Sequence, residues 1–435
     1  MPQIQDSYIL PCGLNLKNRL AKAAMTEGLA DENGLATMDH CRLYDLWAKS
    51  DTGLLITGNV MVDRFHLERA GNIVIDGPQS DERMDALKKF AFASQQYETA
   101  CFVQLSHSGR QTPININKKP KSASDVQLSL PGGQYGKPVS LTEAELEALI
   151  GKFSLAAKAC EEAGFKGVQI HGAHGYLLSQ FLSPKSNKRS DRWGGNLENR
   201  ARLLIEVVSE VQKVTGDGFG VAVKLNSADF QKGGFSFEDC LKVVKWLNAL
   251  NIDFLEISGG TYEQPKMVGL DGALEPVFED ETQMKSSTKV REAFFLHYAT
   301  AIQKIADMPL MITGGFRSKD VMNEALSNGE SDLIGLARPM VPFPLCTKDL
   351  LNGSIAKLPS EDHFIPTSWW LKPTSPFNIL KLAHGLGVMG WYYEKLREMG
   401  AGTMPTLTQG LFKAIFSNFT KDNKLAKAYK KSLKR

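Results

Sequence analysis

Short apolar segments recur along the chain between residues 19 and 338, and helical patterns separate them. Each segment is hydrophobic almost throughout instead of alternating with polar residues, which is typical of strands covered on both faces. Eight such segments occur, at residues 19–25, 53–59, 101–107, 167–172, 220–226, 252–259, 309–315 and 331–338. Because strands and helices alternate, the pattern predicts an α/β fold, specifically a (β/α)8 TIM barrel. An open doubly wound sheet is the alternative, but no GxGxxG sequence follows an early strand.

The helix predicted at residues 142–163 has the clearest boundaries. Thr142 and Glu145 form a capping box at its start, and Gly164 is a stop signal at its end. Residues 199–214 and 237–250 show a similar amphipathic pattern. Residues 108–141, in contrast, show little periodicity, and a loop of this length often covers a functional site.

The barrel is expected to occupy residues 1–345, followed by a mainly helical extension at residues 346–435. In the extension, residues 377–400 and 407–419 predict helices with aromatic faces, and residues 363–377 predict an irregular connector. Residues 421–435 hold seven basic residues against one aspartate, a charge of +6. The whole chain carries only +3, so nucleic-acid binding is not expected. The basic end has two interpretations, a solvated tail or a peripheral contact with an anionic membrane surface.

The six cysteines are widely spaced and form no C-x-x-C pair, which argues against a zinc ribbon or an iron–sulfur cluster. The N-terminus shows no signal-peptide pattern, and no run of about 18 apolar residues predicts a membrane-spanning helix. A reducing, cytoplasmic location is therefore expected.

Polar residues and glycines gather at the C-terminal ends of the predicted strands, where barrel enzymes carry their chemistry. Gly314 and Gly315 follow the seventh strand and Arg338 the eighth, which is the usual phosphate site of such barrels. A tight turn beside a surface arginine is the plainer interpretation. Lys224 ends the fifth strand, where a buried cation needs a partner. An anionic ligand would supply one, and the alternative is a lysine that reaches solvent.

His171 and His174 lie at the end of the fourth strand, and Tyr176 follows two residues later. Glycines beside them indicate that the strand has ended, so the two rings can converge. A metal site lacks a third ligand of suitable spacing, and a structural histidine is the plainer alternative. We favour a pair of hydrogen-bond donors that holds a developing oxyanion, with Tyr176 as a proton donor.

Five motifs resemble the Old Yellow Enzyme family of FMN-dependent NAD(P)H oxidoreductases, or ene-reductases. In chain order they are NRLAKAAMTE, FVQLSHSGRQ, HGAHGYLLSQFLSPKSNKRSDRWGGNLENR, ITGGFRS and GLARPM, and the resemblance covers roughly residues 5–345. It implies one bound FMN across the barrel mouth and NADPH or NADH as the reductant, with no metal and no iron–sulfur cluster.

The resemblance also assigns cofactor contacts by position. Ala24, Met25 and Thr26 would meet the flavin ring, and Gly58 and Asn59 would lie near it. Gln104 would contact the pyrimidine edge, and Lys224 would lie near N1. The residues that would hold the phosphate are Gly314, Gly315, Phe316 and Arg338.

His171 and His174 match the family's substrate-binding pair, and Tyr176 matches its proton donor. The implied reaction reduces the activated C=C bond of an α,β-unsaturated carbonyl or nitro compound, by hydride transfer from reduced FMN N5 and protonation by Tyr176. The alternatives are another substrate such as an amine, a non-flavin phosphate-binding barrel lyase or isomerase, and a flavin-binding interaction protein. The expected partner is a small-molecule substrate. The sequence leaves open the physiological substrate, NADH against NADPH, and assembly into a homo-oligomer.

Overall fold

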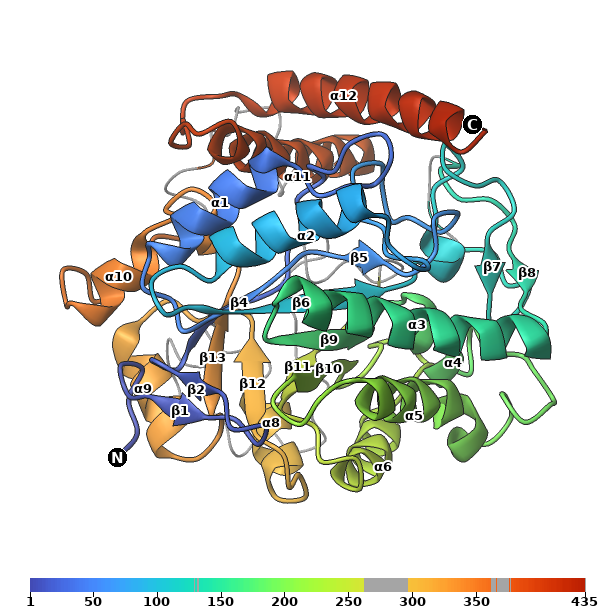
Figure 1. Cartoon of the computed structure of the whole chain (residues 1–435), viewed down its shortest axis with the longest axis horizontal. Helices are drawn as coiled ribbons and strands as arrows, with labels where there is room; N and C mark the ends of the chain where they lie inside the picture. Colours follow the sequence, from blue (N-terminus) through green and yellow to red (C-terminus); the bar gives the residue numbers. More distant parts are fainter. Residues whose placement is uncertain are drawn as a thin grey trace.

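Eight parallel strands close into one barrel in the computed structural model, which describes residues 1–128, 130, 133–261, 296–360, 365, 375 and 377–434 (Figure 1). Neighbouring strands in the barrel follow chain order, and closure comes from β3 pairing with β13. The strands are β3 (Leu20–Lys22), β4 (Leu54–Ile56), β6 (Ala100–Ser106), β9 (Gly167–Gly172), β10 (Gly220–Asn226), β11 (Leu255–Ser258), β12 (Leu310–Thr313) and β13 (Leu333–Leu336). Each predicted segment overlaps one of these strands, so the prediction of a (β/α)8 TIM barrel is confirmed.

The barrel interior is apolar near the N-terminal ends of the strands. Phe102 on β6 and Phe254 lie with their ring centroids 5.6 Å apart. A Cβ atom at Gly167 would lie 2.5 Å from the Phe102 ring, and one at Gly220 would lie 2.3 Å from it. The two strands therefore begin with glycine because the aromatic side chain fills the space beside them.

An N-terminal hairpin closes the same end of the barrel. Its strands are β1 (Tyr8–Ile9) and β2 (Asn15–Leu16), and they pair antiparallel. Leu10 and Leu16 are buried in the cluster that contains the interior phenylalanines. This hairpin was not among the predicted elements, because its strands are too short to show a pattern.

Helices cover the outside of the barrel (Figure 1). They are α1 (Met38–Ala48), α2 (Asp81–Ser94), α3 (Glu143–Ala163), α5 (Leu197–Val214), α6 (Phe237–Asn248), α8 (Leu296–Gln303), α9 (Lys319–Ser327) and α10 (Cys346–Leu351). α3 has the predicted capping box of Thr142 and Glu145, and it ends at Gly164 in the left-handed conformation, with φ of 94°.

Residues 108–141 form little regular structure in their described part. They contain a short 3-10 helix (Gly109–Gln111) and two short strands, β7 (Lys121–Ser122) and β8 (Val139–Ser140). Figure 1 shows this segment beside the C-terminal end of the chain. The Lys430 ammonium lies 3.5 Å from the Ile114 carbonyl oxygen, so the loop and the end of the chain are in contact.

Two long helices form the C-terminal extension, α11 (Asn378–Gly400) and α12 (Leu411–Ser432), and they pack against each other beside α1 (Figure 1). Gly387 and Gly390 permit this approach, since a Cβ at Gly390 would lie 2.8 Å from the Ala414 carbonyl oxygen. The prediction for α12 was too short, because the helix continues through the basic end to Ser432. Most of the predicted connector at 363–377 lies outside the described residues.

The extension is fastened to the barrel through Arg69, which lies in the loop after β5 (Val60–Met61). The Arg69 guanidinium is buried, donates to the Asp422 carboxylate of α12, and lies 3.4 Å from the ring centroid of Tyr393 on α11. Asn418 accepts a further hydrogen bond from it at 3.2 Å. A buried guanidinium needs such partners, so this contact ties both helices to one loop. Among the described residues, no helix has the length and hydropathy needed to cross a bilayer.

Candidate functional site

The chain turns sharply after β9, and this turn brings the predicted histidines together. β9 ends at Gly172, and His174 and Gly175 then adopt positive φ values of 59° and 76°. A left-handed conformation is unfavourable for histidine, but its backbone N–H donates to Asn226 Oδ1 at 3.1 Å. Tyr176 follows as the N-cap residue of α4 (Leu177–Leu182).

The three side chains of this turn converge, and for the two histidines the neighbouring glycines indicated that this was possible. The ring centroids of His171 and His174 lie 5.1 Å apart, and those of His171 and Tyr176 lie 4.8 Å apart. His171 and Tyr176 are buried, and His174 is partly exposed. Two imidazoles and one phenol therefore share a small volume at the C-terminal end of the barrel.

Hydrogen bonds define which nitrogen of His171 can donate. The Ala173 backbone N–H donates to His171 Nδ1 at 3.2 Å, which places the proton of the neutral ring on Nε2. His174 Nε2 shares a 2.6 Å hydrogen bond with Ser258 Oγ at the end of β11. Ser258 could not be recognised from the sequence, because its partner His174 is distant in the chain.

Both histidines are held in the neutral form. Burial, followed by the nearby His174 and Lys224, lowers the pKa of His171 well below its ordinary value. Burial and Lys224 lower the pKa of His174 in the same way. Each ring near pH 7 therefore carries one N–H and one acceptor nitrogen.

An ion pair lies inside the barrel beneath these rings. Lys224 on β10 and Glu256 on β11 are register neighbours, and Lys224 Nζ lies 2.9 Å from Glu256 Oε1. Their side chains are 4% and 0% exposed. From the sequence, we expected Lys224 either to pair with an anionic ligand or to reach solvent. The protein supplies the partner itself, because parallel register points both side chains inward.

The ion pair continues into a chain of amides. Gln169 Nε2 donates to Glu256 Oε2 at 2.7 Å, and Gln104 Nε2 donates to Gln169 Oε1 at 2.7 Å. The order of donors and acceptors along this hydrogen-bonded chain fixes the orientation of the Gln104 amide. A buried network whose members satisfy one another is rigid, so the predicted flavin contact Gln104 is held in place by two residues that the motifs did not reveal.

Two further carboxylates hold the ends of β3 and β4. Glu68 accepts from Thr26 Oγ1 at 2.5 Å and from Asn59 Nδ2 at 2.7 Å. Glu27 accepts the Gly58 backbone N–H at 2.8 Å. A Cβ at Gly58 would lie 2.3 Å from Glu27 Oε2, so only glycine fits there. The residues Ala24 and Met25, just before Thr26, are partly exposed.

The ends of β12 and β13 carry the residues expected to hold a phosphate. Gly314 and Gly315 have φ values of 133° and 83°, which other residues rarely adopt. Arg338 is exposed at the start of a 3-10 helix (Arg338–Met340). Phe316 is buried in the core, so it could contact a phosphate only through its backbone.

Several buried polar atoms at the barrel mouth have no hydrogen-bond partner within the described residues. They are Asn59 Oδ1, both amide atoms of Gln111 and Thr313 Oγ1. Gln111 lies beside the turn at Gly175, where a Cβ would be 2.6 Å from its Oε1. Buried polar atoms are normally paired, so a ligand with hydrogen-bonding groups along its length fits this site. A flavin with a phosphate end has such groups.

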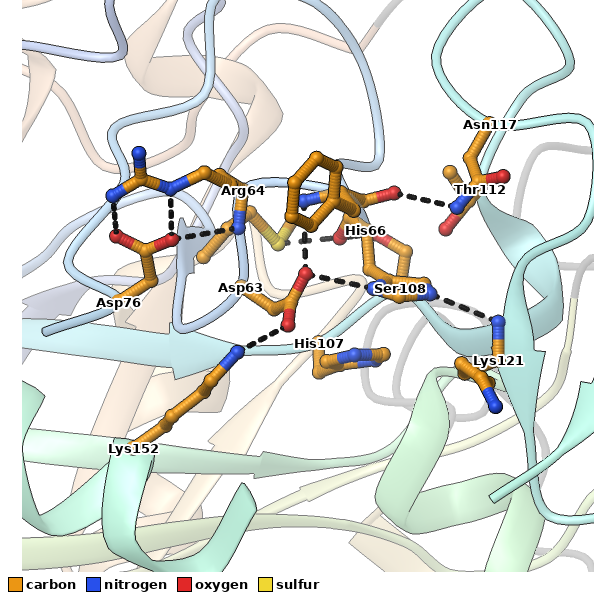
Figure 2. A network of polar contacts seen from close by, with 12 residues as sticks. Asp63, Arg64, His66, Asp76, His107, Ser108, Thr112, Asn117, Lys121 and Lys152 are labelled. Atoms are coloured by element: carbon orange, nitrogen blue, oxygen red, sulfur yellow. Dashed lines mark hydrogen bonds and ion pairs between the residues drawn. The ribbon is translucent and has the colours of Figure 1, made fainter. Parts of the chain in front are cut away.

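A second polar cluster lies beside the mouth (Figure 2). Asp63, His66 and His107 are close enough to bind a metal ion together. However, His66 Nδ1 is 2.8 Å from Asp63 Oδ1, and His66 Nε2 accepts the Lys121 backbone N–H at 2.8 Å. Lys152 Nζ lies 2.5 Å from the other Asp63 oxygen. Both ring nitrogens of His66 are occupied and an ammonium is adjacent, so the cluster is better suited to anchor the 108–141 loop than to bind a cation.

Comparison with known proteins agrees with the fold and identifies the family. Residues 12–351 match the model of the NADH:flavin oxidoreductase / NADH oxidase family. The NADH-dependent flavin oxidoreductase iliE of Hypocrea jecorina (strain QM6a) is 36% identical over 360 residues, which cover 79% of this chain and 87% of that protein. The protein of the same name from Neonectria sp. (strain DH2) is 37% identical over 355 residues, 78% of this chain but only 46% of that protein.

Solved structures show the same barrel. An old yellow enzyme homologue from Zymomonas mobilis superimposes with a TM-score of 0.67 at 24% identity, covering 86% of this chain and all of that one. A 2-naphthoyl-CoA reductase complex superimposes with a TM-score of 0.72 at 25% identity, covering 82% of this chain and 53% of that one. The chain therefore belongs to the NADH:flavin oxidoreductase / NADH oxidase family, which is the old yellow enzyme family.

Proposed function

We propose that the protein is an FMN-dependent NAD(P)H oxidoreductase that reduces the activated C=C bond of α,β-unsaturated carbonyl or nitro compounds. The observation that carries this proposal is the convergence of two neutral imidazoles with the Tyr176 phenol, at centroid distances of 5.1 and 4.8 Å. Family membership supports a flavin and a nicotinamide coenzyme. The six cysteines are all free thiols, which supports a reducing, cytoplasmic setting.

The strand ends would hold the cofactor as the motifs predicted. Contacts to the ring would come from Ala24, Met25, Thr26, Gly58, Asn59, Gln104 and Lys224, and contacts to the phosphate from Gly314, Gly315, Arg338 and the backbone of Phe316. When bound, FMN supplies hydride transfer between the nicotinamide coenzyme and the substrate. The carboxylates of Glu27, Glu68 and Glu256 hold several of these contacts in place before the cofactor arrives.

His171 and His174 would bind the substrate oxygen. The hydrogen bond from Ala173 involves Nδ1 of His171, so the Nε2–H group can donate to a carbonyl or nitro oxygen. Such donors withdraw charge from the C=C bond and stabilise the negative charge that develops on the oxygen. Ser258 fixes the plane of the His174 ring. The Tyr176 ring lies 4.8 Å from the His171 ring, and its phenol would protonate the α-carbon.

The proposal is tested first by an anaerobic visible spectrum of the purified protein. We expect a flavin spectrum that bleaches with NADH or NADPH and returns when 2-cyclohexenone is added. Bleaching without return would leave the family assignment intact but would contradict the reduction of enones. A colourless protein that FMN cannot reconstitute would contradict the cofactor as well.

Replacing both histidines should separate substrate binding from cofactor binding. We expect His171→Ala with His174→Ala to keep the flavin and its reduction by NADH but to slow reoxidation by an enone about 100-fold, because the oxyanion donors are lost. Stopped-flow measurement of the two half-reactions checks this. His174→Asn retains a donor and is the matched control, which should keep most of the rate. Unchanged enone kinetics in the double variant would remove the oxyanion role.

Tyr176→Phe should affect only the proton transfer. We expect reoxidation by an enone to slow by about 100-fold or more, in the range of general acid catalysis, while reduction by NADH stays within about twofold. The phenylalanine keeps the ring packed against His171, so packing is preserved. A similar loss in both half-reactions would contradict the role of Tyr176 as proton donor.

The oxidative half-reaction should not depend on the protonation of the histidines near neutral pH. Because burial lowers both pKa values, the rings stay neutral well below the ordinary histidine pKa of about 6.5 and gain protons only at more acidic pH. The rate of reoxidation of chemically pre-reduced protein by an enone is therefore expected to be flat from about pH 6 to pH 8. A sigmoidal change centred near 6.5 would show that a histidine titrates normally.

A further inference from the structure

The outer surface of α12 combines phenylalanine and lysine almost exclusively. All residues of α12 belong to the described part of the chain, and nine of them are exposed: Phe412, Lys413, Phe416, Phe419, Thr420, Lys421, Lys424, Lys427 and Lys431. We call these nine residues the Phe–Lys face. The three phenylalanines are 70%, 72% and 69% exposed, which is unusual for side chains of this size. Their spacing of four and three residues places them on one stripe of the helix.

The Phe–Lys face contains no carboxylate. The helix sequence has a single acidic residue, Asp422, and it is turned inward to Arg69 and Arg397. Lys434 adds one more exposed cation just beyond the helix. Lys421 is paired with Glu394 of α11, 2.8 Å away, but the face as a whole carries a net positive charge, although the chain as a whole is close to neutral.

The Phe–Lys face is held outward by contacts on the opposite side of α12. Tyr429 donates its hydroxyl to the Arg64 carbonyl oxygen at 2.8 Å, and Ser432 donates to the Glu32 carbonyl oxygen at 2.6 Å. Leu411, Ala414 and Ala426 are buried beneath the helix. These contacts reach both ends of α12, so the basic end is a fixed helical surface and not a loose tail. Figure 1 shows α12 along the edge of the molecule with no element outside it.

We propose that the Phe–Lys face docks α12 flat onto an anionic lipid surface. A helix with aromatic and basic residues on one exposed face can bury its rings at the headgroup boundary while its lysines contact anionic headgroups.

The charge of the Phe–Lys face favours an anionic lipid surface over a second copy of the chain as its partner. In a symmetric dimer the same patch would face itself, so the lysines of one copy would meet those of the other, and the Phe–Lys face of neither copy offers a carboxylate to them. A nucleic acid would satisfy the lysines, but aromatic side chains that stack bases usually line a groove, whereas these rings protrude from one helix. An anionic bilayer satisfies both the rings and the lysines.

Docking would also place the barrel mouth near the lipid. The inner face of α12 contacts the loops that follow β3 and β5, through the Glu32, Arg64 and Arg69 contacts. These loops would then lie about one helix diameter, roughly 10 Å, from the headgroups. The proposal does not depend on which reaction the barrel performs.

The test is flotation of the full-length, flavin-loaded protein with vesicles. We expect binding to vesicles of equal parts phosphatidylcholine and phosphatidylserine, little binding to phosphatidylcholine alone, and release as salt rises from about 0.1 M to about 0.5 M. Phe412→Ser with Phe416→Ser should weaken binding about tenfold or more, and so should Lys424→Glu with Lys427→Glu.

Matched controls lie on α2. Phe92 is 73% exposed, so Phe92→Ser removes an equally exposed ring, and Lys88→Glu with Lys89→Glu makes the same change of charge. Both controls should bind vesicles like the unchanged protein, and all variants should keep their thermal midpoint. Failure of the unchanged protein to bind anionic vesicles would overturn the proposal. Equal vesicle binding by all variants would also overturn it. So would a different partner, shown by a dimer or an oligonucleotide complex that the face variants abolish in a protein that does not bind vesicles.

Discussion

Parallel pairing between β3 and β13 closes the barrel, and every feature of the candidate site depends on it. Leu20 lies beside Ile334 in this pairing, although nearly the whole barrel sequence separates them. Because all eight strands run in the same direction, closure puts their C-terminal ends on one rim. Thr26, His171 and Gly314 come from distant parts of the chain and share this rim for that reason alone.

Acidic side chains give the rim its internal order, and they are buried at Glu256 and partly buried at Glu68. Glu256 neutralises Lys224 and orients the Gln169 and Gln104 amides, while Glu68 holds Thr26 and Asn59. A buried charge such as that of Glu256 is costly unless it is paired, so this carboxylate restricts its partners to a narrow set of positions. The site is therefore shaped before any ligand binds, which is the condition under which polar groups stabilise a transition state effectively.

The C-terminal extension has two different surfaces. Its inner surface is joined to the barrel by Arg69, which contacts both Tyr393 and Asp422. Its outer surface presents rings and lysines to the surroundings. The same 22-residue helix, α12, carries both surfaces, since apolar and charged residues alternate with the helical period and not in blocks. That mixture explains why the basic end looked like a tail in the sequence but is helical through Ser432.

The sequence by itself determined the barrel fold, and it predicted polar residues and glycines at the strand ends. Continuous apolar segments identify buried strands, and glycine-bounded histidines such as His171 and His174 mark a strand end, because these signals are local and repeat along the chain. The capping box at Thr142 and the stop at Gly164 are equally local, and both are present.

Only the tertiary structure decided which residues hold the rim in place. Glu256 as partner of Lys224, Ser258 as partner of His174 and Asp422 as partner of Arg69 follow from strand register and helix packing. No spacing in the sequence encodes these contacts, because the pairs are joined across the fold. The physical reason is that a side chain's direction is fixed locally, whereas its partner is fixed by closure of the sheet and by the docking of the last two helices.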